Sequence, residues 1–410
     1  MSDGKKIKEI KRAKYEKKQR LVRQKEMKKS EQESFIRKHA HFCHLLEENA
    51  LAAIQRDLSS GSDDCCNDDA NKDHFLLREL IEPYTDLKNK RNNYNSIKDQ
   101  RDFDDNEDCN RCTKSHVKLF IAEGAETVRV LIRQSGHSDA IKLRSIMVKP
   151  ATFWDHPVRL LDDVIASSTT GSASEERERV NNLAHPTKED IDPQFIPTAP
   201  PYHILIGNEN ALSSIAGFHI ARGALACGEV PVCTEKMFWK QVQQAVDCNA
   251  QLRIVAMDNV CDTANMGSII RTSRAFDVNI ILLSDDCCDA WSRRAVRVSM
   301  GYVCQAIVFR CICLSSTLDK LHREFGLSTY AAVIDSGPQV MKLENIERGQ
   351  VPRRWCCVLG NEGNGICHDV RIACSQCLCV GMTSGVDSLS VGVAAGIILC
   401  GLKEREQNSD

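Results

Sequence analysis

The chain has 410 residues, of which 42% are apolar and 27% are charged, and its formal net charge is −2. This composition is that of an ordinary soluble protein with room for two or three domains. It excludes a general attraction to nucleic acid through net charge alone. No apolar run reaches the ~20 residues that cross a bilayer, so we expect no membrane contact. The N-terminus lacks the apolar core of a secretory signal.

The cysteines are numerous, but their spacing is not that of a disulfide framework. There are 21, and most of them lie in apolar segments after residue 220. We interpret them as reduced core residues of an intracellular protein. Cys109-x-x-Cys112 and Cys374-x-x-Cys377 each resemble half a zinc site, but they lie far apart in the sequence and have no matching histidine. We therefore expect no bound metal.

Residues 1–60 are predicted to form a basic helical extension. Residues 1–30 carry thirteen Lys or Arg and four acidic residues, a local charge of +9 (13 − 4), and apolar residues recur at helical spacing over residues 35–58. Such an arm suits RNA phosphates or a nuclear import signal, or it is a solvated lysine-rich tail. The acids argue against a mitochondrial presequence, so nucleus or cytoplasm is favoured and the mitochondrion stays open. Residues 61–114 are interpreted as an acidic, polar linker with one short helix near residues 74–81.

Residues 115–248 are predicted to form a small α/β domain. Strand patterns cover residues 119–122, 141–148 and 202–206, and a helix is expected over residues 125–133. Residues 167–200 are polar and proline-containing, which is typical of a surface insertion. No catalytic arrangement of side chains stands out in this half.

Residues 249–405 alternate regularly between apolar strands and helices. Strands are predicted at residues 253–257, 278–283, 303–309, 329–334, 355–359 and 377–380, and helices at 265–276, 291–300, 316–325 and 388–402. This alternation predicts an α/β domain whose parallel sheet is covered on both faces. The last helix is apolar or small on every side, so we expect it to be fully buried.

Three segments of this domain combine glycines with polar side chains. In residues 258–271 a strand end leads through a polar loop into a helix, with Asn265 as a plausible N-cap. Arg271 and Arg274 follow one turn apart and are expected to face away from the buried stripe. Two arginines near a helix start suit a phosphate backbone, or they form a solvated cationic face.

The second segment, residues 360–365, encloses Glu362 between glycines. Glycines at this density allow a ligand to approach the backbone closely, but the spacing is neither that of a dinucleotide fingerprint nor that of a P-loop. In the third segment, residues 380–396, a polar loop feeds a helix capped by Asp387 or Ser388. Each segment alone indicates a ligand loop or a plain structural turn.

Taken together, the three segments resemble motifs 1, 2 and 3 of the SpoU/TrmH class of RNA ribose 2′-O-methyltransferases in the SPOUT superfamily. They occur in the order of that family and at similar separations. Residues 217–226 also resemble the stretch that precedes its catalytic domain. Residues 118–132 resemble the opening of its ribosomal-protein-like RNA substrate-binding domain. The resemblance thus covers residues 115–405, interrupted by the polar insertion.

The resemblance implies a fold, a cofactor and partners. It implies a SPOUT domain over residues 249–405 with a deep trefoil knot, and a homodimer through the knot region. The knot binds S-adenosylmethionine mostly through backbone groups. By position, the cofactor contacts fall on the residues Leu359, Gly360, Val380, Met382 and Leu389. The other partner is RNA, either tRNA or rRNA, and no membrane is involved.

The resemblance also implies roles for particular side chains in methyl transfer to a ribose 2′-hydroxyl. Arg271 is placed at the hydroxyl and the adjacent phosphate, where it orients and stabilises charge because it holds its own proton. Asn265 would hold the loop, Glu362 would anchor loop backbone or Arg271, and Ser388 would line the site. Arg222, Arg271 and Arg274 are the predicted RNA contacts.

The chain departs from the family pattern at three positions. Ser390 replaces an asparagine, while Gly381 and Thr263 replace prolines. The alternative function is therefore a weak or inactive paralogue that acts as an RNA-binding or assembly protein. A cysteine-dependent base methyltransferase is disfavoured because the chain contains no Pro-Cys pair.

Overall fold

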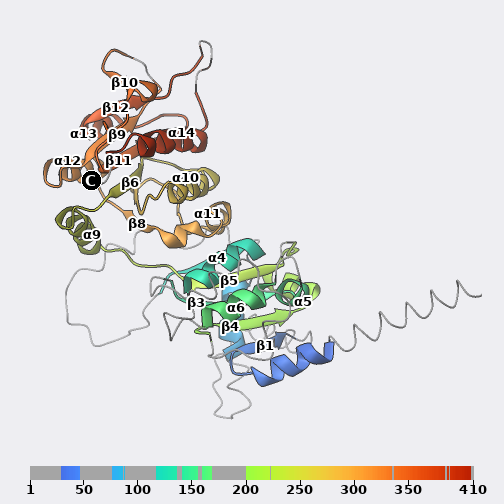
Figure 1. Cartoon of the computed structure of the whole chain (residues 1–410). Helices are drawn as coiled ribbons and strands as arrows, with labels where there is room; N and C mark the ends of the chain where they lie inside the picture. The colour runs from blue at the N-terminus through green and yellow to red at the C-terminus, as the bar shows by residue number, and fades with distance from the viewer. Residues whose placement is uncertain are drawn as a thin grey trace, which may run out of the picture.

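A computed structural model of the protein describes residues 29–46, 76–85, 87, 117–135, 141–155, 159–168, 200–221, 223–334, 337–383, 386 and 388–407. These residues form two lobes, one above the other in Figure 1, and each lobe is built on its own sheet. Both lobes mix helices and strands, so the predicted α/β class is confirmed. The predicted arm over residues 1–28 and Arg222 lie outside the described residues.

The first sheet has five strands in the order β1-β4-β3-β5-β2. Their bounds are Cys43–Leu46, His203–Gly207, Leu143–Val148, Ala224–Glu229 and Leu119–Glu123. β3 runs parallel to β4, whereas β5 runs antiparallel to both β3 and β2. The carboxyl ends of β2, β3 and β4 therefore share one edge. Its helices are α4 (Ala125–Ser135), α5 (Pro150–Trp154), α6 (Leu160–Ser168) and α8 (Glu209–Ala216).

The predicted helix over residues 35–58 is wrong at residues 43–46, and its part over residues 47–58 lies outside the described residues. A helix covers residues 29–38, and Cys43–Leu46 then forms β1, which pairs in parallel with β4. Phe35 and Phe42 are buried in the first lobe. The physical reason is tertiary: an exposed edge of β4 offers backbone partners that outweigh local helical spacing.

The segment predicted as a polar linker also contributes to this lobe. A helix over residues 76–81 continues into a 3₁₀ turn at Glu82–Tyr84. Ile81 and Tyr84 are fully buried, and the Tyr84 hydroxyl donates to the Ser145 carbonyl at 2.8 Å. The short helix is thus part of the core rather than a solvated connection.

The second sheet has seven strands, and all neighbouring pairs are parallel. Its order is β10-β12-β9-β11-β6-β7-β8, with bounds Val340–Lys342, Gln376–Cys379, Ser328–Ala332, Arg354–Leu359, Leu252–Met257, Ile280–Leu283 and Ile307–Arg310. The predicted parallel sheet is confirmed. β6 and β11, which carry two of the three predicted motifs, are central neighbours.

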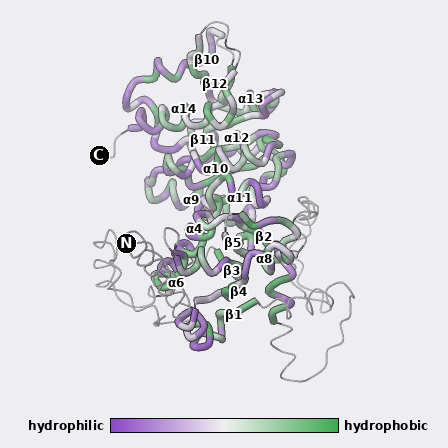
Figure 2. The backbone as a smooth tube through the Cα atoms, turned by 90° about the vertical axis from the view of Figure 1, so that its right-hand side faces the viewer, coloured by the Kyte–Doolittle hydropathy of each residue, from purple (hydrophilic) through white to green (hydrophobic). Residues whose placement is uncertain are grey.

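Helices cover both faces of this sheet because its strands carry apolar side chains on both faces. Val255 and Met257 of β6 pack with α10 (Thr263–Ala275), α11 (Arg293–Val298) and α14 (Val391–Glu404). Ile254 and Ala256 pack on the other face with α9 (Glu235–Asp247), α12 (Leu314–Arg323) and α13 (His368–Ala373). Figure 2 shows hydrophobic stretches in the strands of both lobes.

Two local predictions for this domain are wrong, and several elements were missed. Residues 303–305 belong to a 3₁₀ turn (Tyr302–Gln305) because Gly301 before it has φ +78°, and β8 begins only at Ile307. The short elements β10 and α13 were not predicted, and neither was the 13-residue helix α9 that precedes residue 249. α14 is not fully buried: Val393 and Ile397 are 52% and 39% exposed.

The two lobes meet through β2 and α11. The rings of Phe120 and Trp291 lie 5.1 Å apart, and both residues are buried. The apolar core around them is continuous from one lobe to the other. Within the described part of the chain, no helix is long and apolar enough to cross a membrane.

Candidate active site

The three predicted motif segments follow β6, β11 and β12, so they meet at the carboxyl edge of the second sheet. Loops at this edge of a parallel sheet are where ligands bind in α/β folds. The local order of the chain therefore places all three segments around one site.

The second segment is a tight glycine hairpin after β11. Asn361 and Gly365 exchange backbone hydrogen bonds at 3.0 and 2.9 Å, and the Asn361 side-chain oxygen accepts from the Gly363 N–H at 2.8 Å. A Cβ on Gly360 would lie 2.3 Å from the Gly365 carbonyl carbon. Only glycine fits at position 360 without moving the backbone.

The first and second segments are tied to each other. The Asn361 side-chain amide donates to the Asn259 carbonyl at 2.8 Å. The Cys367 N–H donates to the buried Asp258 carboxylate at 2.7 Å. The Asn265 side-chain amide donates to Glu362. The structure therefore brings Asn265 and Glu362 together, whereas no hydrogen bond or ion pair of the described residues joins Glu362 to Arg271, the side chain expected beside it.

Asp262, and not Asn265, caps α10. Its carboxylate accepts from the N–H groups of Ala264 and Asn265 at 2.8 and 2.9 Å, so the predicted cap is wrong. Asp262, one turn earlier, is the cap because its carboxylate accepts from two helix N–H groups and its negative charge suits the positive end of the helix. Because Asp262 takes the cap, the Asn265 side chain is available to Glu362.

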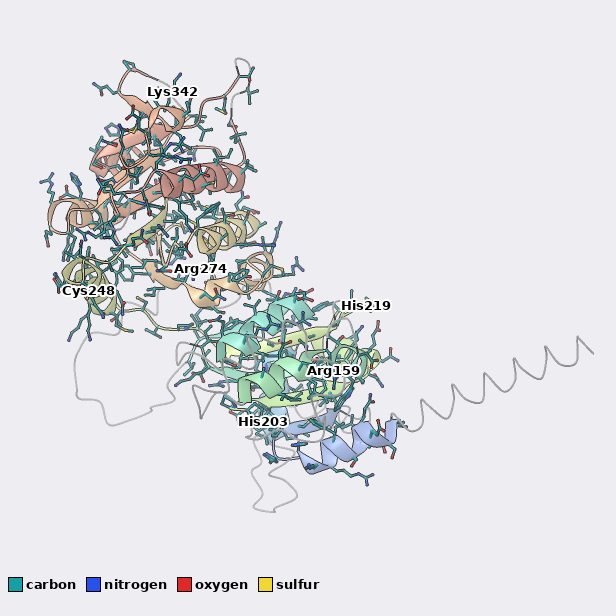
Figure 3. The ribbon with its side chains drawn as sticks, viewed as in Figure 1. Arg159, His203, His219, Cys248, Arg274 and Lys342 are labelled. Atoms are coloured by element: carbon teal, nitrogen blue, oxygen red, sulfur yellow. The ribbon has the colours of Figure 1, made fainter. Side chains whose placement is uncertain are left out.

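The two predicted arginines of α10 differ. Arg271 is exposed, and no hydrogen bond or ion pair joins its guanidinium to the rest of the described chain. Arg274 is half-buried and donates to the Val278 carbonyl at 2.7 Å and to Asn279. Burial lowers the pKa of Arg274. Figure 3 shows Arg274 in the second lobe. Arg271 is thus available to a ligand, whereas Arg274 is engaged at the end of its own helix.

The third segment lies beside α10. The predicted cap of the last helix is wrong in its position: α14 begins at Val391, and Ser390 stands at the cap without a side-chain hydrogen bond. Ser388 is exposed and Leu389 half-buried just before it, whereas Asp387 lies outside the described residues. A Cβ on Gly392 would lie 2.8 Å from the Ser268 hydroxyl. Ser268 is one turn from both Asn265 and Arg271, so this contact brings the three segments to one place.

Two residues of the site were not singled out from the sequence. Asn361 organises the glycine loop, and its only signal was its place inside the motif. Glu344 has no sequence signal: its carboxylate accepts from the Gly381 N–H at 3.4 Å, and a Cβ on Gly381 would lie 2.2 Å from it. A proline at position 381 would lose this hydrogen bond, because it has no N–H, and its ring would displace the exposed Glu344 carboxylate.

Other features of the described residues point elsewhere. No group of three His, Cys, Asp or Glu side chains there could hold a metal ion, and the cysteines described are free thiols. Burial raises the pKa of the Cys357 thiol to about 12, as expected for an inert core cysteine. A cavity of about 550 Å³ lies in the first lobe at the amino ends of β3 and β4, beside His203.

The glycine hairpin, the Asn265–Glu362 pair and the available Arg271 together form a candidate ligand-binding site at the carboxyl edge of the parallel sheet. Residues 252–400 match the model of the SpoU rRNA Methylase family, and this domain belongs to that family. The predicted resemblance is confirmed.

Individual relatives are distant. The chain is 24% identical over 209 residues to the 23S rRNA (guanosine-2′-O-)-methyltransferase RlmB of Acinetobacter baylyi, covering 50% of this chain and 81% of that protein. It is 30% identical over 146 residues to RlmB of Nitrosomonas europaea, covering 36% and 54%. It spans about half the length of several mycobacterial relatives. An AdoMet-bound rRNA methyltransferase from Sinorhizobium meliloti is 18% identical, with a TM-score of 0.48 over 70% of this chain and 87% of that one.

Proposed function

We propose that this protein transfers a methyl group from S-adenosylmethionine to a ribose 2′-hydroxyl of RNA. The observation that carries the proposal is the hydrogen bond between Asn265 and Glu362, which joins two motif segments of a SpoU-family domain beside the third. The substrate is RNA, either rRNA or tRNA. Proteins of the family that match this chain are named for such substrates.

The loops fit S-adenosylmethionine, whose sulfonium supplies an activated methyl group. Gly360 and Gly381 expose main chain where a side chain would collide with neighbouring atoms. Leu359 is buried beneath Gly360, while Val380, Met382 and Leu389 are half-buried around it. Bare backbone with apolar flanks suits a ligand that has both polar and apolar parts. These five residues would hold the cofactor.

The chain's own contribution is to align the two reacting groups. Arg271 holds its proton, so it orients the phosphate and the 2′-hydroxyl and stabilises the charge that develops as the hydroxyl proton leaves. The Asn265–Glu362 pair keeps the glycine loop at a fixed distance from α10. Ser388 lines the entrance to the site. Positioning of this kind supplies a large part of the rate enhancement in two-substrate reactions.

A deep trefoil knot is part of this proposal. The chain leaves the central strand β11, passes β9 to reach β12, and returns as α14. α14 packs on α10, which follows β6 on the other side of β11. This return path, which the order of the strands supports, is the one that the last helix of a knotted SPOUT domain takes.

The proposal also includes a homodimer that buries one face of α14. Val393 and Ile397 are four residues apart and exposed, and Val386 in the preceding loop is 50% exposed. Such apolar residues at helical spacing are typical of a helix that packs against a partner. Sedimentation should give a dimer for the wild type and a monomer for Val393→Asp. Val232→Asp changes another exposed valine, outside α14, and should stay dimeric. A dimeric Val393→Asp variant would exclude this interface.

The activity is tested with methyl-labelled S-adenosylmethionine and total RNA. We expect label in RNA with the wild type and a loss of about 10²- to 10³-fold with Arg271→Ala. Arg323→Ala removes an exposed arginine of α12 and should retain activity. RNA binding without methyl transfer by the wild type would instead support the non-catalytic alternative.

A further inference from the structure

A group of charged side chains lies where the carboxyl edge of the first sheet meets α11. We call this group the seam. Its cationic or ionisable members are Lys149 and His219 from the first lobe and Arg293, Arg294 and Arg297 from α11. Its carboxylates are Glu123, Glu209 and Asp262.

Carboxylates in the seam are shared between basic side chains. Glu209 lies 2.8 Å from Lys149 and 3.0 Å from His219, and its hydrogen bond with Lys149 lowers the pKa of Glu209. Glu123 lies 3.4 Å from Arg297 and 3.8 Å from Arg293. Glu123 can neutralise only one of its two arginines, so this sharing holds both guanidinium groups in place without cancelling their charge.

The balance of charge in the seam is positive. Its members include four permanent cations and three carboxylates, a net charge of +1 (4 − 3) with His219 neutral, and the exposed Arg271 of the neighbouring helix α10 adds a further cation beside it. The whole chain, in contrast, has a net charge of −2. The surface that joins the lobes is therefore of the opposite sign to the protein as a whole.

The seam runs without a break from the first lobe to the candidate active site. Phe218, next to His219, lies under the Arg293 guanidinium, 4.7 Å from its ring centre. The next residue, Arg294, reaches Asp262 at 3.8 Å. Asp262 caps α10 through the N–H of Asn265, whose side chain binds Glu362.

Key members of the seam are open to a large ligand. The side chains of His219 and Arg294 are 68% and 58% exposed. Figure 3 places His219 at the end of the first lobe that faces the second lobe, far from His203 and its cavity. Because Phe120 and Trp291 pack across the junction, the seam has a fixed length. A rigid, exposed, positive track suits a polyanion with regularly spaced charges.

We infer that the seam binds the phosphate backbone of the RNA and sets the distance between the segment read by the first lobe and the nucleotide placed at Arg271. The inference rests on the proposed function, since it takes RNA as the substrate. Arginine guanidinium groups match phosphate geometry, and such contacts fix the register of the nucleic acid rather than read its sequence. His219 and Arg294 are the most exposed of the paired seam residues, and they would position the RNA.

The test measures RNA binding by the full chain, separately from methyl transfer. A fluorescein-labelled RNA hairpin is titrated with protein at several salt concentrations, and binding is followed by fluorescence anisotropy. Each lost phosphate contact should lower the slope of log K against log salt by about 0.7–0.9. We expect about tenfold weaker binding for Arg294→Ala with His219→Ala, and a smaller slope. Arg294→Lys keeps the charge and should keep the slope.

Arg323→Ala is the matched control. This exposed arginine pairs with Asp319 on α12, outside the seam, so its removal should leave binding unchanged. Circular dichroism confirms that each variant is folded, and calorimetry with S-adenosylhomocysteine should give the wild-type affinity. Unchanged binding and slope in the seam variants, or an equal loss in Arg323→Ala, would overturn the inference.

The two proposals fail in different ways. A wild type that binds the hairpin in a salt-dependent, seam-dependent manner but methylates no RNA would contradict the proposed function and leave the seam intact. A wild type that methylates RNA while the seam variants bind and methylate normally would contradict only the inference that the seam binds RNA.

Discussion

The two sheets use their carboxyl edges in different ways. In the second sheet, the loops are tied to one another: Asn361 binds Asn259, and Asp258 binds Cys367. In the first sheet, Glu123 at the same kind of edge holds Arg293 and Arg297 of the other lobe. The loops at the edge of the second sheet form hydrogen bonds with one another, whereas Glu123 at the edge of the first sheet forms ion pairs with the other lobe.

This difference matches two physical tasks. A site that aligns reacting groups needs fixed loops, because small misplacements cost much of the rate. A surface that holds a phosphate backbone needs charge that is placed but not neutralised. The same α/β architecture thus supports both tasks, and the pairing of its edge residues distinguishes them.

The largest effect on stability is expected for Glu406, whose carboxylate lies at the amino ends of β6 and β11. The Glu406 carboxylate binds Arg253 twice at 2.6 Å and accepts from the Trp355 indole at 2.6 Å. Glu406→Ala would leave a buried arginine and a buried indole N–H without this partner. We expect a loss of about 3–5 kcal/mol in the free energy of unfolding, measured with urea.

The control for this change is Glu404→Ala, which removes a carboxylate whose side chain is 65% exposed on the same C-terminal turn. Its effect should stay within about 0.5 kcal/mol. Equal stabilities for the two variants would show that the second sheet does not need this buried cluster.

A medium effect is expected within the glycine loop. Gly360→Ala places a Cβ 2.3 Å from the backbone of Gly365, so the hairpin must shift. We expect a cost of about 1–3 kcal/mol in stability and weaker binding of S-adenosylhomocysteine by calorimetry. Gly363→Ala, whose Cβ would lie 3.4 Å from Asn361 Oδ1, is the control and should bind nearly as well as the wild type. Equal binding by both variants would mean that the loop is not closed as described.

The smallest effect is a pH dependence of stability that comes from Asp277, which lies beside Arg253 near the amino end of β6. Lys403 and then Arg253 lower the pKa of Asp277 below its ordinary value of 3.8. A carboxyl group with a lowered pKa stabilises the fold above pH 3.8, and this contribution is lost as pH falls through its folded-state pKa. The stability difference between wild type and Asp277→Asn should therefore be constant near neutral pH and shrink in acid. Lys403→Met should weaken the same dependence, and parallel curves for wild type and Asp277→Asn would contradict it.

Much of the second lobe could be predicted from sequence because its signals are local. Buried strands such as Trp355–Leu359 are continuous apolar runs, and glycine loops mark their ends. The gathering of the three segments at one site was implied by the family resemblance, whereas the hydrogen bond between Asn265 and Glu362 was not predicted. The choice of Asp262 over Asn265 as cap was not predicted, because both residue types suit that role and their backbone geometry decides between them.

The first lobe was harder to predict because its signals are non-local. Residues 43–46 carry apolar side chains compatible with a helix, and only the edge of β4 makes them a strand. The seam is likewise assembled from stretches that lie far apart in the sequence, around Glu123, Lys149, His219, Asp262 and Arg294, and no local pattern predicts that they meet. Exposure of Val393 was missed because an apolar helix does not reveal whether its own chain or a partner covers it.

The position of the transferred methyl group tests the account most directly. RNA incubated with the full chain and S-adenosylmethionine is digested to nucleosides, which are analysed by mass spectrometry. The account predicts methyl groups on ribose with the wild type and Arg323→Ala, and only trace amounts with Arg271→Ala. Methylated bases without methylated ribose, or equal ribose methylation in Arg271→Ala, would contradict it.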